Sequence, residues 1–207
     1  MDSLESAFEG RDVSRETISR LSEFVALVKK WNPKINLVSK GSMDDIWTRH
    51  ILDSAQILEY APPGIDRWMD LGSGGGFPGV VIATMLNEIQ PETVVTLVEA
   101  DQRKAAFLKT VARELSVTME IRAQRIESLA PQGADVVSAR ALAPLPKLLE
   151  YVSANLRPGG CALLLKGENA GNEVKAALEA WRFACETYPS KTNNGAVILK
   201  IGDIERA

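Results

Sequence analysis

The sequence has few cysteines, a single histidine and no long apolar run. Its two cysteines, Cys161 and Cys185, cannot build a disulfide framework, so a reducing, cytoplasmic setting is expected. No apolar stretch has the length needed to cross a bilayer, and the acidic first residues differ from a signal peptide. We therefore expect no membrane partner and no metal. The lone histidine, His50, also leaves little scope for general acid–base catalysis.

Charge of one sign does not dominate either. There are 24 Lys and Arg residues against 27 Asp and Glu, for a formal net charge of −3 at pH 7. Such a chain has no global attraction to nucleic acid, so any contact with RNA must come from a local basic patch. With 207 residues, the chain can form one sizeable domain with a full core.

Residues 1–64 are predicted to form an N-terminal helical extension. Apolar residues recur at helical spacing between Ser14, the expected N-cap, and Asn32-Pro33, the expected end. A second helix is expected to start at Ser42 in a capping-box pattern and to end at Ala61-Pro-Pro-Gly64.

From residue 65 to 207, strand-like runs alternate with helical patterns. This alternation predicts an α/β, Rossmann-like domain with a mostly parallel sheet and helices on both faces. Such sheets bind ligands beyond the carboxyl ends of their strands. The expected strands are Arg67–Leu71, Thr93–Val98, Val117–Ile121, Asp135–Ala139, Cys161–Leu165 and Ala196–Ile201, and the expected helices are Pro78–Leu86, Gln102–Leu115, Leu145–Leu156 and Ala170–Phe183.

A glycine loop, Gly72-Ser-Gly-Gly-Gly-Phe-Pro-Gly79, follows the first strand. Glycines allow a tight turn and a close approach by a ligand, and the following helix offers free N–H donors. No Gly-x-x-x-x-Gly-Lys-Ser/Thr is present, which disfavours an ATP or GTP cradle. The spacing Gly74-x-Gly76-x-x-Gly79 also fits a dinucleotide fingerprint, and a purely structural turn is the third reading.

Two carboxylates at strand ends narrow the choice. Asp70 precedes the loop, where it would repel a pyrophosphate but suit a cationic ligand. S-adenosylmethionine carries a sulfonium and an ammonium and lacks phosphates. Glu99 ends the next strand and could accept hydrogen bonds from both ribose hydroxyls, which either ligand would offer. The pattern favours S-adenosylmethionine bound by Asp70, Gly74 and Glu99, although Asp70 could instead only cap a turn.

The next two strand ends bear on the rest of the ligand and on the reaction. Ile126 could form an apolar wall for an adenine ring and Glu127 could meet its amine, unless this is simply a solvated loop. Enzymes that methylate the amino group of adenine or cytosine would carry an Asn/Asp-Pro-Pro-Tyr/Phe motif at Arg140, and this sequence lacks it. Neither cysteine has the setting of a nucleophile. A target that is already nucleophilic, such as guanine N7, needs positioning more than a base, so no catalytic residue is predicted.

Local basic residues could supply an RNA surface. The basic residues near the N-terminus lie close together in the sequence. The basic residues at the strand ends would lie near them, beside the cofactor. Ordinary solvated side chains are the equal alternative. The residues are Lys29, Lys30, Lys34, Lys40, Arg49, Arg103, Lys104, Arg140 and Lys166.

Several motifs together resemble the bacterial RsmG (GidB) family. They are the glycine loop with its Phe-Pro-Gly end, Trp31-Asn-Pro-Lys-Ile-Asn-Leu-Val38, His50-Ile-Leu-Asp-Ser54, Ser138-Ala-Arg-Ala141 and Leu165-Lys-Gly167. The resemblance implies a class I S-adenosylmethionine-dependent methyltransferase acting on N7 of one guanine in the 530 loop of 16S rRNA (guanine 527 in rRNA numbering), free or in the small ribosomal subunit. It implies cofactor contacts at Gly72, Phe77, Ile126, Glu127 and Arg140.

Some choices stay open at this stage. Lys166, at the end of the fifth strand, is our candidate for holding the guanine. His50 either contacts substrate or packs within the helix face. A monomer is expected, since nothing suggests an obligate dimer. Rival functions are a methyltransferase for a protein or small molecule, a non-catalytic nucleoside sensor and a dinucleotide oxidoreductase.

Overall fold

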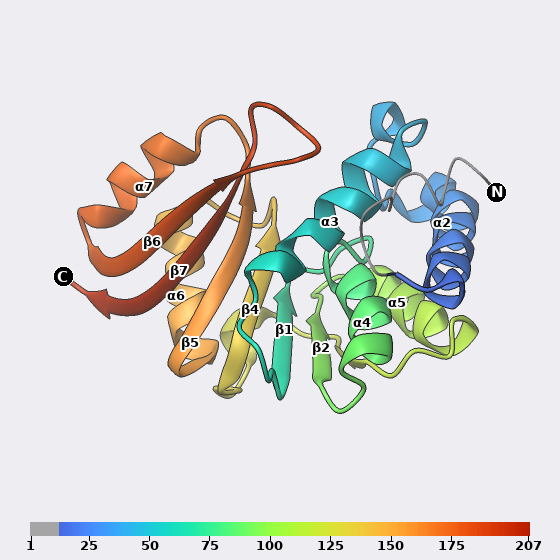
Figure 1. Ribbon diagram of the computed structural model, residues 1–207, viewed down its shortest axis with the longest axis horizontal. Helices are drawn as coiled ribbons and strands as arrows, with labels where there is room; N and C mark the ends of the chain where they lie inside the picture. Colours follow the sequence, from blue (N-terminus) through green and yellow to red (C-terminus); the bar gives the residue numbers. More distant parts are fainter. Residues whose placement is uncertain (1–12) are drawn as a thin grey trace.

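A computed structural model describes residues 13–207 and places them around one seven-stranded sheet (Figure 1). The strand order is β3-β2-β1-β4-β5-β7-β6, and only the pairings of β7 with β5 and with β6 are antiparallel. The predicted α/β class is confirmed. The strands are β1 Arg67–Leu71, β2 Val94–Val98, β3 Glu120–Arg122, β4 Ala134–Arg140, β5 Leu156–Lys166, β6 Trp181–Pro189 and β7 Val197–Arg206.

Helices cover both faces of the sheet because successive strand residues point to opposite sides. Trp68 of β1 lies in the core beneath α2, α4 and α5, whereas its neighbour Met69 lies in the core beneath α6 and α7. The longer helices are α2 Arg15–Ile35, α4 Gly79–Ile89, α5 Gln102–Glu114, α6 Leu145–Asn155 and α7 Ala170–Leu178. The order of strands reverses between β1 and β4, the place where such sheets bind ligands.

Helix α2 begins as predicted and ends later than predicted. Ser14 accepts a hydrogen bond from the Thr17 amide at 3.2 Å, as an N-cap does. The helix continues through Pro33 to Ile35. Its end is held by Asn32, whose Oδ1 accepts the amides of Leu37 and Val38 at 2.7 and 2.9 Å. The side chain of Asn32 thus caps the helix rather than stopping it.

The second expected helix is a series of short turns of different pitch. Ser42 does not cap it, because its Oγ donates to the carbonyl of Ser39 at 2.9 Å. The segment changes pitch at each step, and a π-helical turn is a frequent feature of functional sites. The turns are a 3-10 turn Lys40–Ser42, a π-helix Trp47–Leu52, α3 Asp53–Ala55 and a 3-10 helix Gln56–Tyr60.

The N-terminal helices share one core with the sheet. Leu21, Phe24 and Val28 of α2 are fully buried and lie in the same cluster as Val80 of α4. The division between residues 1–64 and 65–207 stays a prediction, and residues 1–12 lie outside the described part. Within residues 13–207, no helix is long and apolar enough to cross a membrane.

The C-terminal part corrects one expectation. The helix predicted over 170–183 ends at Leu178, and β6 begins at Trp181. Trp181 is buried at 4% exposure, and the guanidinium of Arg206 lies 4.1 Å from its ring centroid. The antiparallel pairing of β6 with β7 forms the edge of the sheet (Figure 1). Most of β6 is exposed, so its strand state depends on β7 rather than on an apolar pattern of its own.

Candidate cofactor and substrate site

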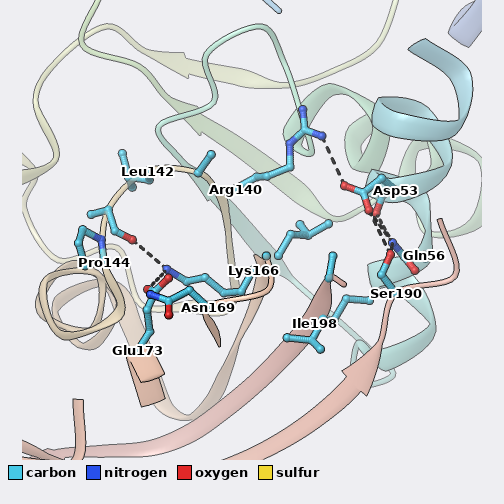
Figure 2. Close-up of a pocket in the computed structure, with 16 residues that line it drawn as sticks. Asp53, Gln56, Arg140, Leu142, Pro144, Lys166, Asn169, Glu173, Ser190 and Ile198 are labelled. Carbon is cyan, nitrogen blue, oxygen red and sulfur yellow. Dashed lines mark hydrogen bonds and ion pairs between the residues drawn. The ribbon is translucent and has the colours of Figure 1, made fainter. Parts of the chain in front are cut away.

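Two cavities open at the carboxyl ends of the parallel strands. The glycine-loop cleft, about 440 Å³, lies among Gly72–Gly75, Phe77, Glu99 and Ile126. The β5 cavity, about 590 Å³, lies among Asp53, Lys166, Glu173 and Ile198 (Figure 2). Residues 140–143 line both, so this segment is the shared wall.

The structure brings most of the predicted site residues to these cavities. Asp70 lines neither cavity, and Lys166 lines the β5 cavity only. The remaining ones line the glycine-loop cleft, and Arg140 also lines the β5 cavity. They are Gly72, Gly74, Phe77, Glu99, Ile126, Glu127 and Arg140.

The loop needs a glycine at position 72. Gly72 has a φ of 66°, in the left-handed region that side chains rarely adopt. A Cβ there would stand 2.5 Å from Cδ1 of Leu142, which belongs to the shared wall. Leu142 therefore packs directly on the loop, and the sequence pattern gave no sign of this contact.

Asp70 is buried under the loop at 0% exposure. Ser138 lies beside it in the register of β1 with β4 and donates to Oδ1 at 2.7 Å, while the Gly79 amide donates to Oδ2 at 3.2 Å. Burial raises the pKa of Asp70 to about 6, against the effect of these hydrogen bonds. The carboxyl group thus ties β1, β4 and the start of α4 together, and its charge would reach a ligand only through the loop.

Glu99 links the loop to the next helix. Its Oε2 accepts the Gly74 amide at 2.8 Å and its Oε1 accepts the Asp101 amide at 2.7 Å. Each carboxylate oxygen has a further lone pair, and the side chain lines the cleft. Glu99 can therefore hold the loop and accept hydroxyl hydrogen bonds at the same time.

At the far end of the cleft, the wall is formed by a 3-10 turn and by α6. The turn Ile126–Ser128 places Ile126 and Glu127 on the wall. Glu127 accepts a hydrogen bond from the Tyr151 hydroxyl at 2.5 Å, which lowers the pKa of the carboxyl group. Tyr151 also lines the cleft. Sequence reasoning missed it, because it lies inside a helical pattern with no motif of its own.

Arg140 is held by the π-helical turn. It donates from Nη2 to His50 Nδ1 at 2.7 Å and from Nη1 to the Arg49 carbonyl at 3.1 Å. A guanidinium only donates, so Nδ1 is the acceptor and the proton of the ring lies on Nε2, which donates to Ser42 Oγ at 2.8 Å. Burial, and then the charge of Arg140, lowers the pKa of His50 to about 4.

The same turn stacks against the glycine loop. The ring centroids of His50 and Phe77 are 4.9 Å apart, and the Arg140 guanidinium carbon lies 5.3 Å from the Phe77 centroid. His50 lines neither cavity. The structure therefore shows His50 packed between Phe77 and Arg140, so its contribution to the site is made through them.

Lys166 holds the far end of the shared wall. Its ammonium donates to the Ala143 carbonyl at 2.9 Å and to Glu173 at 2.7 Å, and the side chain is 9% exposed. Glu173 also accepts the Leu145 amide at 2.7 Å. Figure 2 shows this group on one side of the β5 cavity, with Asp53, Gln56 and Ser190 on the other. Lys166 thus positions the wall that separates the two cavities.

The basic residues of α2 lie on the surface, away from both cavities. Lys29, Lys30 and Lys34 are exposed. Lys30 and Lys34 line a groove with Trp31 and Arg113. Lys104, in contrast, lines the glycine-loop cleft. Whether these groups act together on RNA stays a prediction.

Known proteins resemble this chain in sequence and in fold. The family model GidB, described as rRNA small subunit methyltransferase G, matches residues 17–195. The Ribosomal RNA small subunit methyltransferase G of Ruegeria sp. (strain TM1040) is 51% identical over 195 residues, with 94% of this chain and 95% of that one covered. The protein of the same name from Cereibacter sphaeroides is 51% identical over 197 residues, with 95% and 96% covered.

A solved structure shows the same fold. The O-methyltransferase from Bacillus cereus in complex with SAH superimposes with a TM-score of 0.64 at 14% identity, covering 98% of each chain. At this identity the likeness concerns the fold alone. The predicted Rossmann-like methyltransferase fold is confirmed.

Proposed function

The chain belongs to the rRNA small subunit methyltransferase G (GidB) family, and we propose that it transfers the methyl group of S-adenosyl-L-methionine to N7 of one guanine in the 530 loop of 16S rRNA. The substrate is the free rRNA or the small ribosomal subunit, and the enzyme acts as a cytoplasmic monomer. The observation that carries the proposal is the shared wall, which sets a nucleoside-sized cleft beside a second cavity.

The residues of the glycine-loop cleft fit this cofactor. The free lone pairs of Glu99 suit the ribose hydroxyls, and Ile126 with Glu127 suits the face and the amine of adenine. Gly72, with a φ of 66° and Leu142 packed against it, gives the loop its tight turn at the edge of the cleft. When bound, the cofactor supplies a methyl group on a cationic sulfur.

The protein's share of the chemistry is positioning. Guanine N7 carries a lone pair and no proton, so no side chain has to remove one before attack. Glu99 at the ribose and Ile126 with Glu127 at the adenine would hold the cofactor and present its methyl group for direct in-line transfer to N7. Among residues 13–207, His50 and the two cysteines line neither cavity, so the proposal assigns them no role as a base or as a covalent nucleophile.

The test is methyl transfer with labelled cofactor. Purified protein is incubated with tritiated S-adenosylmethionine and either free 16S rRNA or small subunits, and the labelled nucleotide is mapped. We expect label at N7 of a single guanine in the 530 loop. Label on protein, on another nucleotide position or on no RNA would overturn the proposal.

A further inference from the structure

Asp53 faces the β5 cavity with an acceptor that is only partly engaged. Its side chain is 15% exposed, and it lines the β5 cavity but not the glycine-loop cleft. Oδ1 accepts hydrogen bonds from Gln56 at 2.9 Å and from Thr192 at 2.8 Å. Oδ2 has one long contact, at 3.4 Å, with Arg140. The carboxylate is thus fixed in orientation by one oxygen, which leaves the other able to accept more hydrogen bonds.

Two other polar side chains of this cavity, Lys166 and Gln56, are engaged with neighbouring groups. Lys166 donates to Ala143 and Glu173. The Gln56 amide donates to Asp53, while its carbonyl accepts the Lys191 amide at 2.8 Å. Two carboxylates of the cavity therefore keep an oxygen that can meet a ligand: Asp53, and Glu173, whose two hydrogen bonds both go to Oε2. Of these, Asp53 is the one that lies across the cavity from Leu142 (Figure 2).

The remaining walls suit a flat ring. Apolar side chains surround the cavity between its two polar ends. A base taken out of its stack is held in this way, by apolar contact on its faces and hydrogen bonds at its edge. These side chains are Leu142, Pro144, Leu165, Val197 and Ile198.

We infer that the β5 cavity is the subsite for the target guanine and that Asp53 selects guanine through its Watson–Crick edge. This rests on the proposed function. Guanine presents two adjacent donors there, N1–H and the 2-amino group, which match a carboxylate that can only accept. Adenine presents an unprotonated N1 at this edge, and its lone pair would face the negative charge.

The orientation agrees with the position of the shared wall. N7 lies on the opposite side of the purine from the 2-amino group. Figure 2 shows Asp53 and Leu142 on opposite sides of the cavity. A guanine whose Watson–Crick edge meets Asp53 therefore turns N7 toward Leu142, the part of the shared wall across the cavity, whereas Arg140 at the start of the wall lies beside Asp53.

The test compares guanine with inosine, which lacks the 2-amino group, at the modified position of otherwise identical RNA. For the unaltered enzyme, we expect kcat/KM to be about tenfold higher or more with guanine, the usual effect of a hydrogen bond to a charged group. In Asp53→Asn the ratio of kcat/KM for guanine to kcat/KM for inosine should fall toward one. The asparagine amide offers the base either a weaker acceptor, its oxygen, or a donor, its nitrogen. Asp53→Ala should act in the same way.

A matched control is Glu173→Gln, the same chemical change at the other end of the cavity. It is expected to lower both rates and to keep the guanine preference. A purely structural role of Asp53 would likewise lower both rates equally, so an unchanged ratio in Asp53→Asn overturns the inference.

Two further outcomes are measured on the unaltered enzyme alone, so they do not depend on whether a variant folds. An unaltered enzyme that methylates N7 of guanine and inosine equally well refutes the role of Asp53 while the proposed function stands. An enzyme that methylates neither RNA refutes the proposed function itself.

Discussion

The imidazole of His50 accepts a 2.7 Å hydrogen bond from the guanidinium of Arg140, a residue 90 positions later in the chain. This bond fixes the tautomer of the ring and fixes Arg140 at the start of the shared wall. Burial, and then the charge of Arg140, lowers the pKa of this histidine, the only one in the sequence, so its ring is neutral at pH 7.

Removing the acceptor at His50 should impair methyl transfer without unfolding the protein. His50→Phe keeps a ring against Phe77 but removes the acceptor of the Arg140 Nη2 group, and we expect kcat/KM to fall about tenfold. His50→Gln offers an acceptor again and should recover part of the activity. Steady-state methylation of rRNA by both variants checks this. Equal activity of His50→Phe and the unaltered enzyme would contradict it.

Stability should depend on pH through two opposing groups. The pKa of His50 is lowered from 6.5 to about 4, so its contribution is present above pH 6.5 and is lost as the pH falls toward 4. The pKa of Asp70 is raised from 3.8 to about 6, so its contribution is present below pH 3.8 and is lost as the pH rises through 6. Between about pH 4 and 6 the two slopes oppose each other.

Single substitutions should separate the pH dependence of stability that is due to His50 from that due to Asp70. In Asp70→Asn, the free energy of unfolding should rise with pH over this range, because the opposing effect of Asp70 is gone, whereas the effects of His50 and of carboxyl groups with a lowered pKa such as Glu127 remain. In His50→Gln it should fall over the same range. Urea unfolding at several pH values measures both. Parallel pH profiles for the two variants would show that these groups do not control the stability.

The close contact at Gly72 should make the cofactor site sensitive to one methyl group. Gly72→Ala places a Cβ against Leu142 at a φ of 66°, and we expect at least a tenfold loss of affinity for S-adenosylhomocysteine by calorimetry. Gly64→Ala is the control, since Gly64 has the same φ with no atom near its Cβ position. Both variants bear the backbone strain of about 1 kcal/mol. Only the first should lose affinity.

Lys166 should matter for stability as well as activity. Lys166→Met removes the donor to Ala143 and leaves Glu173 without its cation, so a loss of about 1–3 kcal/mol is expected from urea unfolding. Lys147→Met removes an exposed, solvent-screened pair with Glu150 and should cost clearly less than Lys166→Met. If both variants cost the same, Lys166 does not hold the wall.

Local patterns were enough to place β1, β2, β4 and the glycine loop, whereas β3 begins at Glu120 instead of Val117 and β5 begins at Leu156 instead of Cys161. The strand runs that end at Leu71 and Val98 are apolar and short, and the glycine loop is a single run of consecutive residues. Such features need no partner from elsewhere in the chain. They therefore give the fold class and most of the residues of the glycine-loop cleft.

Features that depend on distant partners were missed. Strand β6 is mostly exposed and depends on β7, so its sequence resembled the end of a helix. The contact of Leu142 with Gly72 joins residues 70 positions apart. The burial of Asp70 depends on Ser138 in another strand, which no pattern before the loop could indicate.

The shared wall at residues 140–143 has a consequence for the order of events at the two cavities. Because the same backbone borders both, a ligand that shifts it in one cavity changes the shape of the other. Thermodynamic linkage makes this coupling reciprocal: whatever cofactor binding does to the affinity for the base, the base does equally to the affinity for the cofactor. Ala141 lies within this wall, directly after the end of β4, with a φ of 50° that side chains rarely adopt.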